Sequence, residues 1–268
     1  MKFDYHTHHE RCGHAEGSIS DYIQSAITKG FNMIGISDHS PYFYSEEDHL
    51  FPHISMANSH FPAYVEEILE LKNEFKGQIE VLLGVESDFF PEHIELYKRQ
   101  YEKYPFDYII GSVHHVDGRN IFEKNRWEGL SIKEKIQTKN NYYELIQQSA
   151  QSGVFQILGH IDAMKGYYPE FSLIQTNAID QTLSILSQFE IAIEVNTSGK
   201  NKYCGGWYPA DEILERALFH GVKVTFGSDA HSADRVGDEF DEVQKRLKEI
   251  GYKEWAIFKK RKRFIVSF

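Results

Sequence analysis

Short apolar runs alternate along this chain with longer segments in which apolar residues recur every three or four positions. A run of four or five apolar residues is typical of a buried strand, and the three-to-four spacing is typical of a helix with one buried face. Ile19, Ile23 and Ile27 have the helical spacing, and Gly30 follows them as a helix stop would. The pattern therefore predicts a helix over residues 19–30.

Seven segments show each pattern, and the two kinds alternate along the chain. The apolar runs predict strands at residues 1–5, 33–36, 79–83, 108–110, 155–158, 191–195 and 222–226. The helical spacing predicts helices over residues 19–30, 61–76, 91–103, 131–152, 173–188, 210–220 and 239–250. Residues 40–57 and 117–130 show no clear period and are predicted to be loops. The basic run 259–263 is expected to be solvated, ahead of a short strand at 264–266.

This order of elements predicts the fold class. Strands that alternate with helices form parallel sheets, because each helix carries the chain back to the start of the next strand. No linker rich in Pro, Gly or Ser divides the chain, so residues 1–268 are expected to form a single α/β domain. Seven strand–helix units in one domain favour a barrel that is closed or nearly closed, with an open doubly wound sheet as the alternative.

Composition and charge exclude several classes of protein. Hydrophobic residues make up 41% of the chain, which is enough for a core and rules out disorder as the main state. The net charge of −11 argues against nucleic acid as a partner, since a groove for a phosphate backbone needs surplus Lys and Arg. Only Cys12 and Cys204 are present, so no disulfide framework is implied. Because the start lacks the apolar core of a signal peptide and no run could span a membrane, we expect a soluble, cytoplasmic protein.

Side chains that can bind metal follow strand after strand at its carboxyl end. His6 and His8 stand two residues apart, so an extended chain points both to the same side. The others are Asp38, His39, Glu86, His114, His160, Asp229 and His231, with His14 just beyond the first pair. Barrels and open parallel sheets both place their active sites at this edge, so these residues are expected to converge.

Seven histidines with Glu86 and Asp229 give nine candidate ligands, which exceed the needs of one or two ions. They predict a cluster of two or three divalent transition metal ions, in which the two carboxylates act as bridges. Mixed nitrogen and oxygen ligands favour Zn, Mn or Fe over Mg or Ca. Such a cluster leaves the pocket positive, which suits a small anionic substrate such as a phosphate monoester. A water bridging two ions would be largely hydroxide at neutral pH and could attack phosphorus in line.

These motifs, taken in order, resemble those of the polymerase-and-histidinol-phosphatase (PHP) superfamily, and most of all its monofunctional L-histidinol-phosphate phosphatases. The matching stretches are His6-Thr7-His8 with His14, Ser37-Asp38-His39, Gly84-Val85-Glu86, Gly111-Ser112-Val113-His114, Gly159-His160-Ile161-Asp162, Asn196-Thr197-Ser198-Gly199 and Gly227-Ser228-Asp229-Ala230-His231. The resemblance spans almost the whole chain. It implies a distorted (β/α)7 TIM-like barrel, a trinuclear metal site and the hydrolysis of L-histidinol phosphate in histidine biosynthesis.

The resemblance also implies how the ligands are shared among the ions. The first ion takes His6, His8, Glu86 and Asp229, the second shares Glu86 and adds His114 and His160, and the third takes His14, His39 and His231. Glu86 and Asp229 are then catalytic residues through the ions they bind. Asp38 is a further catalytic candidate, which either orients a ligand or handles a proton.

Several cationic residues are candidates for contact with the substrate. Relatives often carry an arginine shortly after the Asn-Thr-Ser-Gly turn, where this chain has Asn201. The phosphate contact is therefore expected to pass to Lys202 or Lys200, as a point charge in place of a fork. The further candidates are Lys165, Arg235 and Arg11, each with a scaffold role as an equal alternative.

Three other functions fit parts of the pattern. A PHP-type phosphoesterase acting on nucleotides or oligonucleotides is the nearest, but the chain lacks a basic, aromatic-studded groove. A metal-stabilised scaffold without activity fits poorly with a complete ligand set. A metal-dependent amidohydrolase on a similar barrel does not account for the third set, His14, His39 and His231. No pattern indicates an oligomeric state.

Overall fold

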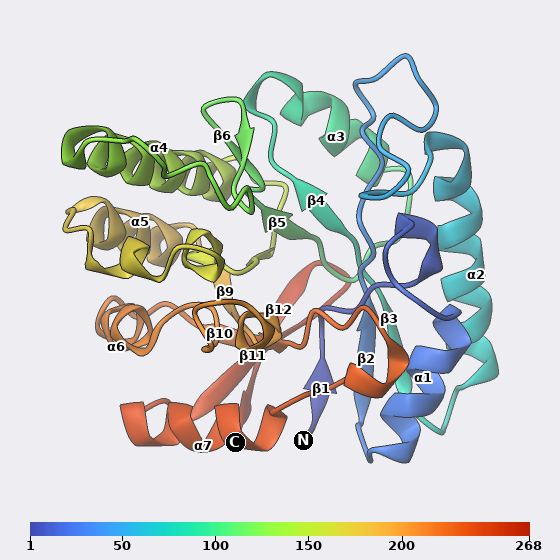
Figure 1. Cartoon of the computed structure of the whole chain (residues 1–268). Helices are drawn as coiled ribbons and strands as arrows, with labels where there is room; N and C mark the ends of the chain where they lie inside the picture. The colour runs from blue at the N-terminus through green and yellow to red at the C-terminus, as the bar shows by residue number, and fades with distance from the viewer.

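Parallel strands occupy the centre of the molecule and helices surround them (Figure 1). This computed structural model describes residues 1–268. The parallel strands are β1 (Phe3–Asp4), β2 (Met33–Ile36), β3 (Glu80–Leu83), β4 (Glu86–Asp88), β5 (Ile110–Ser112), β8 (Ile157–Leu158), β9 (Ala192–Asn196) and β10 (Val224–Gly227). The helices are α1 (Ile19–Thr28), α2 (Phe61–Glu74), α3 (Ile94–Tyr101), α4 (Ile132–Gln151), α5 (Ala178–Gln188), α6 (Asp211–Phe219) and α7 (Phe240–Ile250).

The strands form two parallel sheets, β1-β2-β3 and β10-β9-β8-β5-β4, which are joined at both ends. β3 and β4 are successive parts of one strand, and they pair with β2 and with β5 respectively. On the other side, the Tyr5 amide donates to the Phe226 carbonyl (3.1 Å) and the Asp229 amide donates to the His6 carbonyl (2.8 Å). Seven strand positions therefore follow one another around a ring, as predicted for a distorted (β/α)7 barrel.

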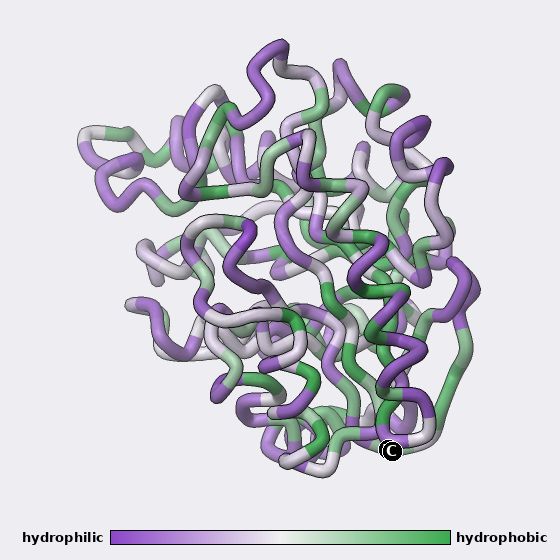
Figure 2. Tube along the Cα trace, turned by 90° about the vertical axis from the view of Figure 1, so that its right-hand side faces the viewer, coloured by the Kyte–Doolittle hydropathy of each residue, from purple (hydrophilic) through white to green (hydrophobic).

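Local sequence signals explain where the main helices begin. Ser18 caps α1 and Ser131 caps α4, and in each case an acidic side chain three residues later, Asp21 or Glu134, returns a hydrogen bond. This reciprocal capping box satisfies amide groups that have no partner inside the helix. Figure 2 shows hydrophobic and hydrophilic residues alternating along the helices, whose apolar faces pack on the strands.

A tyrosine side chain occupies the inside of the ring. Tyr108 is fully buried there, and its hydroxyl donates to the Tyr5 carbonyl (2.5 Å). Gly35 and Gly84 make room for it, since a Cβ atom would lie 2.0 Å from the Tyr108 hydroxyl at the first and 2.3 Å from its ring at the second. The interior is thus packed with side chains and leaves the functional site to the carboxyl edge.

Some predicted boundaries differ from the structure. β5 includes Gly111 and Ser112, which were expected to follow it, and α5 begins at Ala178 because residues 169–173 form a 3₁₀ turn. A small hairpin, β6 (His115–Val116) and β7 (Arg119–Asn120), opens the segment that was predicted to be an irregular loop.

The largest error concerns the last residues of the chain. The prediction missed β11 (Glu254–Lys259), which pairs with β12 (Lys262–Ser267) in an antiparallel hairpin. The basic run 259–263, which spans the turn of this hairpin, is not simply solvated, because Lys259 pairs with Glu80 (2.6 Å) and half-buried Arg263 pairs with Glu190 (2.6 Å). None of the helices combines the length and the apolar character needed to cross a membrane.

Candidate metal centre

A polar cavity of about 400 Å³ opens at the carboxyl edge of the strands. It is lined by His14, His39, Glu86, His114, His160, Asp229 and His231, together with Phe122, Ser198, Asn201, Lys202 and Arg235. The two remaining predicted ligands, His6 and His8, lie beneath it with 0% and 1% exposure. The structure thus brings all nine predicted ligands together.

Glu86 lies at the centre of this group, and histidines that follow four different strands surround its carboxylate. Its Oε1 is 3.0 Å from His160 Nε2 and 3.5 Å from His114 Nε2. Its Oε2 is 2.9 Å from His39 Nδ1 and 3.3 Å from His6 Nε2. This carboxylate is therefore placed to be shared between ions, as a bridging ligand must be.

Asp229 is a second carboxylate surrounded by histidines, and it lies near His8 and His231. Its Oδ1 lies 3.0 Å from His8 Nε2, and His231 lies on the same side, where its Nε2 is 2.9 Å from His14 Nε2. Asp229 has φ 54° and His160 has φ 26°, in the left-handed region that non-glycine residues rarely adopt. Such strain is held by the surrounding structure and is common at functional sites.

The donor set fits divalent transition metal ions. Four groups have ligand atoms within 4.8 Å of one another. Three of them consist of predicted ligands, and they are His6/His8/Glu86, His39/Glu86/His114 and His8/His39/His231; the fourth is His8/Cys12/Asp38. The group His6/His8/Glu86 matches the predicted ligands of the first ion. His39 belongs to two groups, one with the second-ion ligands Glu86 and His114 and one with the third-ion ligand His231. His6 Nε2 and His8 Nε2 are buried without a hydrogen-bond partner, which is costly for a polar atom unless a ligand satisfies it.

Three of these histidines have a buried carboxylate behind the ring. Glu194 Oε1 lies 2.6 Å from His6 Nδ1, and Asp88 Oδ1 lies 2.6 Å from His114 Nδ1. Each carboxylate is placed to accept a hydrogen bond from the Nδ1–H group, which leaves the Nε2 lone pair directed at the cavity. The sequence reasoning missed both residues, although an acidic residue inside an otherwise apolar strand, as Glu194 is, was the signal that could have found it.

Asp38 plays the same part for His8, at 3.2 Å from its Nδ1. Its carboxylate is fully buried and does not line the cavity, so of the two predicted roles the geometry agrees with orientation of a ligand. His9, which was also missed, is buried on the far side of Asp38 at 3.4 Å and stacks on Tyr64.

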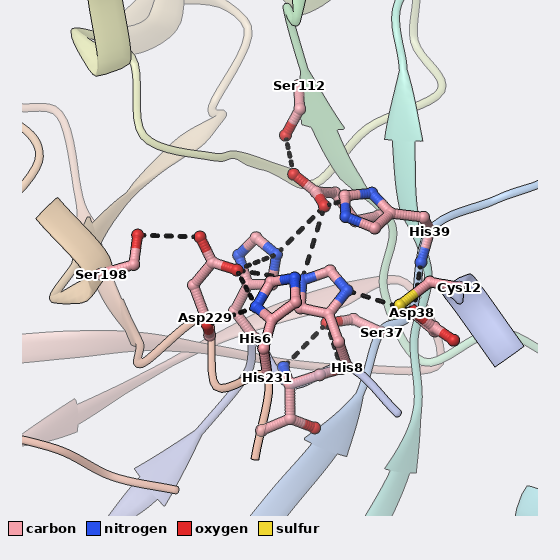
Figure 3. A network of polar contacts seen from close by, with 12 residues as sticks. His6, His8, Cys12, Ser37, Asp38, His39, Ser112, Ser198, Asp229 and His231 are labelled. Atoms are coloured by element: carbon pink, nitrogen blue, oxygen red, sulfur yellow. Dashed lines mark hydrogen bonds and ion pairs between the residues drawn. The ribbon is translucent and has the colours of Figure 1, made fainter. Parts of the chain in front are cut away.

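Serine hydroxyls hold the two central carboxylates. Ser112 donates to Glu86 Oε1 (2.6 Å), and Ser198 Oγ lies 2.9 Å from Asp229 Oδ2 (Figure 3). Both serines sit at the ends of strands, within motifs that the sequence singled out for their neighbouring ligands. They fix which carboxylate oxygen faces which imidazole.

Burial and neighbouring charges shift the pKa values of the histidines in opposite directions in two parts of the centre. Burial lowers the pKa of His8 and of His114, but the carboxylates around each ring more than offset it and raise both values to about 9. Burial and neighbouring imidazoles lower the pKa of His14 to about 4 and that of His231 to about 3. Burial alone would raise the pKa of Glu86, yet the histidines hold it well below its usual range.

Two of the predicted substrate contacts line the cavity. Lys202 and Arg235 face it from the segments after β9 and β10. Arg235 is held from behind, because its Nε donates to Asp238 Oδ2 (2.9 Å). Its two terminal nitrogens face the Asn201 amide, whose oxygen accepts from both once the amide is turned toward them. Asn201, where the family resemblance led us to expect an arginine, therefore contacts an arginine from the next loop.

The other predicted contacts do not line this cavity. Lys200, the alternative to Lys202, pairs with Glu239 (3.6 Å) and lies beside a different cavity. Lys165 is buried, pairs with Asp162 (2.8 Å) and donates to the Trp207 carbonyl (2.6 Å), so its charge is used inside the fold beside a different cavity. Arg11 pairs with Glu67 of α2 and does not line the metal cavity. For Lys165 and Arg11 the alternative scaffold role is the one that the structure supports.

Comparison with known proteins identifies the family. The model of the PHP domain matches residues 4–198, which is more than half of the chain. The chain belongs to the PHP family. Among PHP relatives, it is 29% identical to the histidinol-phosphatase of Bacillus subtilis, over 92% of this chain and 99% of that protein. It is 31% identical to a protein of Schizosaccharomyces pombe named "Probable histidinol-phosphatase", over 97% of this chain and 90% of that one.

Solved structures confirm the PHP fold. The histidinol phosphate phosphatase of Lactococcus lactis superposes with a TM-score of 0.79 at 22% identity, covering 98% of each chain. That protein was crystallised with zinc, L-histidinol and phosphate. The fold class and the family resemblance predicted from the motifs are therefore confirmed.

Proposed function

We propose that this PHP-family protein is a histidinol-phosphatase, which uses divalent metal ions to hydrolyse L-histidinol phosphate to L-histidinol and inorganic phosphate. The observation that carries the proposal is the convergence of nine nitrogen and oxygen ligands on one cavity that also presents Lys202 and Arg235. Relatives that carry the name histidinol-phosphatase along more than nine-tenths of this chain support the choice of substrate.

The nine ligands are proposed to hold two to three ions of Zn, Mn or Fe, shared as the family motifs imply. Zinc occupies the Lactococcus protein, and the donor set here, with seven imidazoles and two carboxylates, suits the same class of ion. Ions bound there act as Lewis acids toward the phosphate ester and the attacking water.

The chain itself supplies orientation and charge. The carboxylates Glu194, Asp38 and Asp88 keep three imidazoles in the tautomer that a ligand needs, and fix their direction. Arg235 presents a planar fork that matches a phosphate, already oriented by its hydrogen bonds to Asn201 and Asp238. A fork that is oriented before binding loses less entropy when the phosphate arrives.

The test is phosphate release from L-histidinol phosphate, measured beside a panel of nucleotides and sugar phosphates, with metal content determined on the same sample. We expect a strong preference for L-histidinol phosphate and roughly two to three ions per chain. A preference for nucleotides would favour the alternative PHP phosphoesterase activity. A full metal load without turnover would favour a scaffold.

Variants separate the metal site from the rest of the chain. His8→Ala and Asp229→Ala should abolish turnover by emptying the first ion position, while the fold is retained. His53→Ala is the control, because this histidine is exposed in the 40–57 loop and does not line the cavity. Normal rates in a folded, metal-depleted variant would overturn the mechanism.

A further inference from the structure

We propose that Phe122 forms a subsite for a planar ring in the leaving group, so that this enzyme selects phosphate esters of alcohols that carry an aromatic ring. This inference rests on the proposed phosphatase activity and specifies its leaving group. Phe122 is the one hydrophobic residue among the twelve that line the metal cavity. An apolar ring in an otherwise polar cavity offers a surface that water does not solvate well and that another ring can cover.

Phe122 is held in place before any ligand binds. Buried Arg126 donates to the carbonyls of Val116, Arg119 and Asn120, and so locks the loop that carries Phe122. The Phe122 amide donates to the Asn120 side chain (2.8 Å). A loop fixed in this way can present its side chain to a partner without the entropic cost of ordering the loop on binding.

The neighbours of Phe122 place the ring subsite beside the metal ligands. Its ring centroid lies 5.9 Å from that of His114, a predicted ligand, and 6.3 Å from that of Tyr167 in an edge-on arrangement. The loop around residue 122 therefore places an aromatic ring directly beside His114, at the edge of the proposed metal centre. A leaving group whose ring is a few bonds from its phosphate can span the two.

Cations occupy the outer aromatic residues and not Phe122. Lys124 lies 5.1 Å from the Tyr167 ring and 5.2 Å from the Tyr203 ring, and Lys202 lies 5.7 Å from the Tyr167 ring. These tyrosines are engaged by lysine ammonium groups. Phe122 has no such cation, and it lines the cavity together with Lys202. Of this aromatic group, Phe122 is thus the ring available to the substrate.

The experiment compares two substrates on the metal-loaded enzyme, L-histidinol phosphate and the ringless phosphoethanolamine. In Phe122→Leu, which keeps apolar bulk but loses the ring, the ratio of kcat/KM for the two substrates should fall roughly five- to tenfold, mainly through the KM for L-histidinol phosphate. Phe122→Tyr, which keeps a ring, should restore most of the ratio. Phe219→Leu is the matched control, since this phenylalanine is 86% exposed at the end of α6.

The outcomes distinguish this inference from the proposed function. If the wild-type enzyme does not hydrolyse L-histidinol phosphate, the proposed function fails first. If it does, an equal loss for both substrates in Phe122→Leu, or an unchanged ratio, overturns the ring subsite. A Phe122→Tyr variant as poor as Phe122→Leu would overturn it as well, because stacking needs only a ring.

Discussion

Single side chains set the charge state of the metal centre. His8 and His114 keep a proton well above neutral pH because carboxylates surround them, whereas His14 and His231 are neutral. A metal ion binds only the neutral form of imidazole. An ion must therefore displace a proton from His8 and from His114 before it can bind them, but not from His14 or His231.

This difference predicts proton release on metal binding. At pH 7.5 the metal-free protein holds protons on His8 and His114, so zinc binding should expel them, and the apparent affinity should rise with pH toward about 9. Calorimetry in buffers of different ionisation enthalpy measures the protons released. His114→Ala should release about one proton fewer. Binding heats that are independent of the buffer would contradict the prediction.

Glu194 provides a test of the carboxylates behind the ligands. Glu194→Gln keeps the shape of the side chain but removes the charge that accepts the His6 Nδ1 proton. We expect zinc affinity to fall roughly ten- to a hundredfold with the fold intact. Glu215→Gln, an exposed site on α6, is the control. Equal zinc affinity in the two variants would show that Glu194 does not tune the site.

Substitution of Arg235 and of Arg11 tests which cationic residue contacts the substrate and which has only a scaffold role. Arg235→Ala should lower kcat/KM for L-histidinol phosphate roughly ten- to a hundredfold, because it removes a charged fork from the cavity. Arg11→Ala should change it less than about twofold, since its partner is Glu67 outside the cavity. Lys202→Ala should chiefly raise KM. A large loss in Arg11→Ala would return that residue to the site.

At the scale of elements, long connections shape the site that the strands support. The loop over residues 40–57 packs against the turn that carries His14, and a Cβ atom on Gly13 would lie 1.9 Å from the Pro52 carbonyl oxygen. This close approach needs a glycine, which also has φ 80°. The loop thus fixes the turn that carries His14, a proposed ligand, from outside the barrel.

Gly13→Ala should therefore destabilise more than backbone strain alone explains. Gly77 is the matched control, because it has φ 88° but open space around its Cα. Gly77→Ala should cost about 1–2 kcal/mol of unfolding free energy, and Gly13→Ala clearly more, with a lower metal content. Urea unfolding and metal analysis measure both. An equal loss of unfolding free energy in the two variants would mean that the 40–57 loop moves away from residue 13 at no energetic cost.

The elements also show which signals the sequence carries. Capped helices and apolar parallel strands were predicted to within a few residues, because their signals are local. The β11–β12 hairpin was missed because its turn is formed by Lys260 and Arg261 at φ 51° and 60°, without the glycine or asparagine that usually marks such a turn. The hairpin is therefore specified by the packing of its strands against the barrel and not by the sequence of its turn.

For the whole molecule, this hairpin ties the last strands to the first. The Tyr5 hydroxyl accepts from the Phe258 amide (2.7 Å) and donates to the Phe258 carbonyl (2.9 Å), inside the core. β1 carries the chain directly to His6. The hairpin therefore supports the strand that leads to the first two proposed ligands, His6 and His8.

Tyr5→Phe should cost about 1–3 kcal/mol of unfolding free energy, because it leaves buried backbone groups of Phe258 without a partner. Tyr143→Phe is the control, since the Tyr143 hydroxyl is buried with no partner to lose and its removal should be close to neutral. Thermal or urea unfolding compares the two. A neutral Tyr5→Phe would show that the hairpin is held by its apolar residues alone.

The sequence by itself determined the order of the elements, the family and the set of nine candidate ligands, because parallel strands of a barrel all end at one edge. Residues at those ends must then converge, however far apart they stand in the chain. Only the tertiary structure decided which neighbours support them, such as Glu194 behind His6, and which cations reach the cavity. Arg235 reaches it and Arg11 does not, because a long side chain is directed by its local partners, Asn201 or Glu67, and those contacts leave no pattern in the sequence.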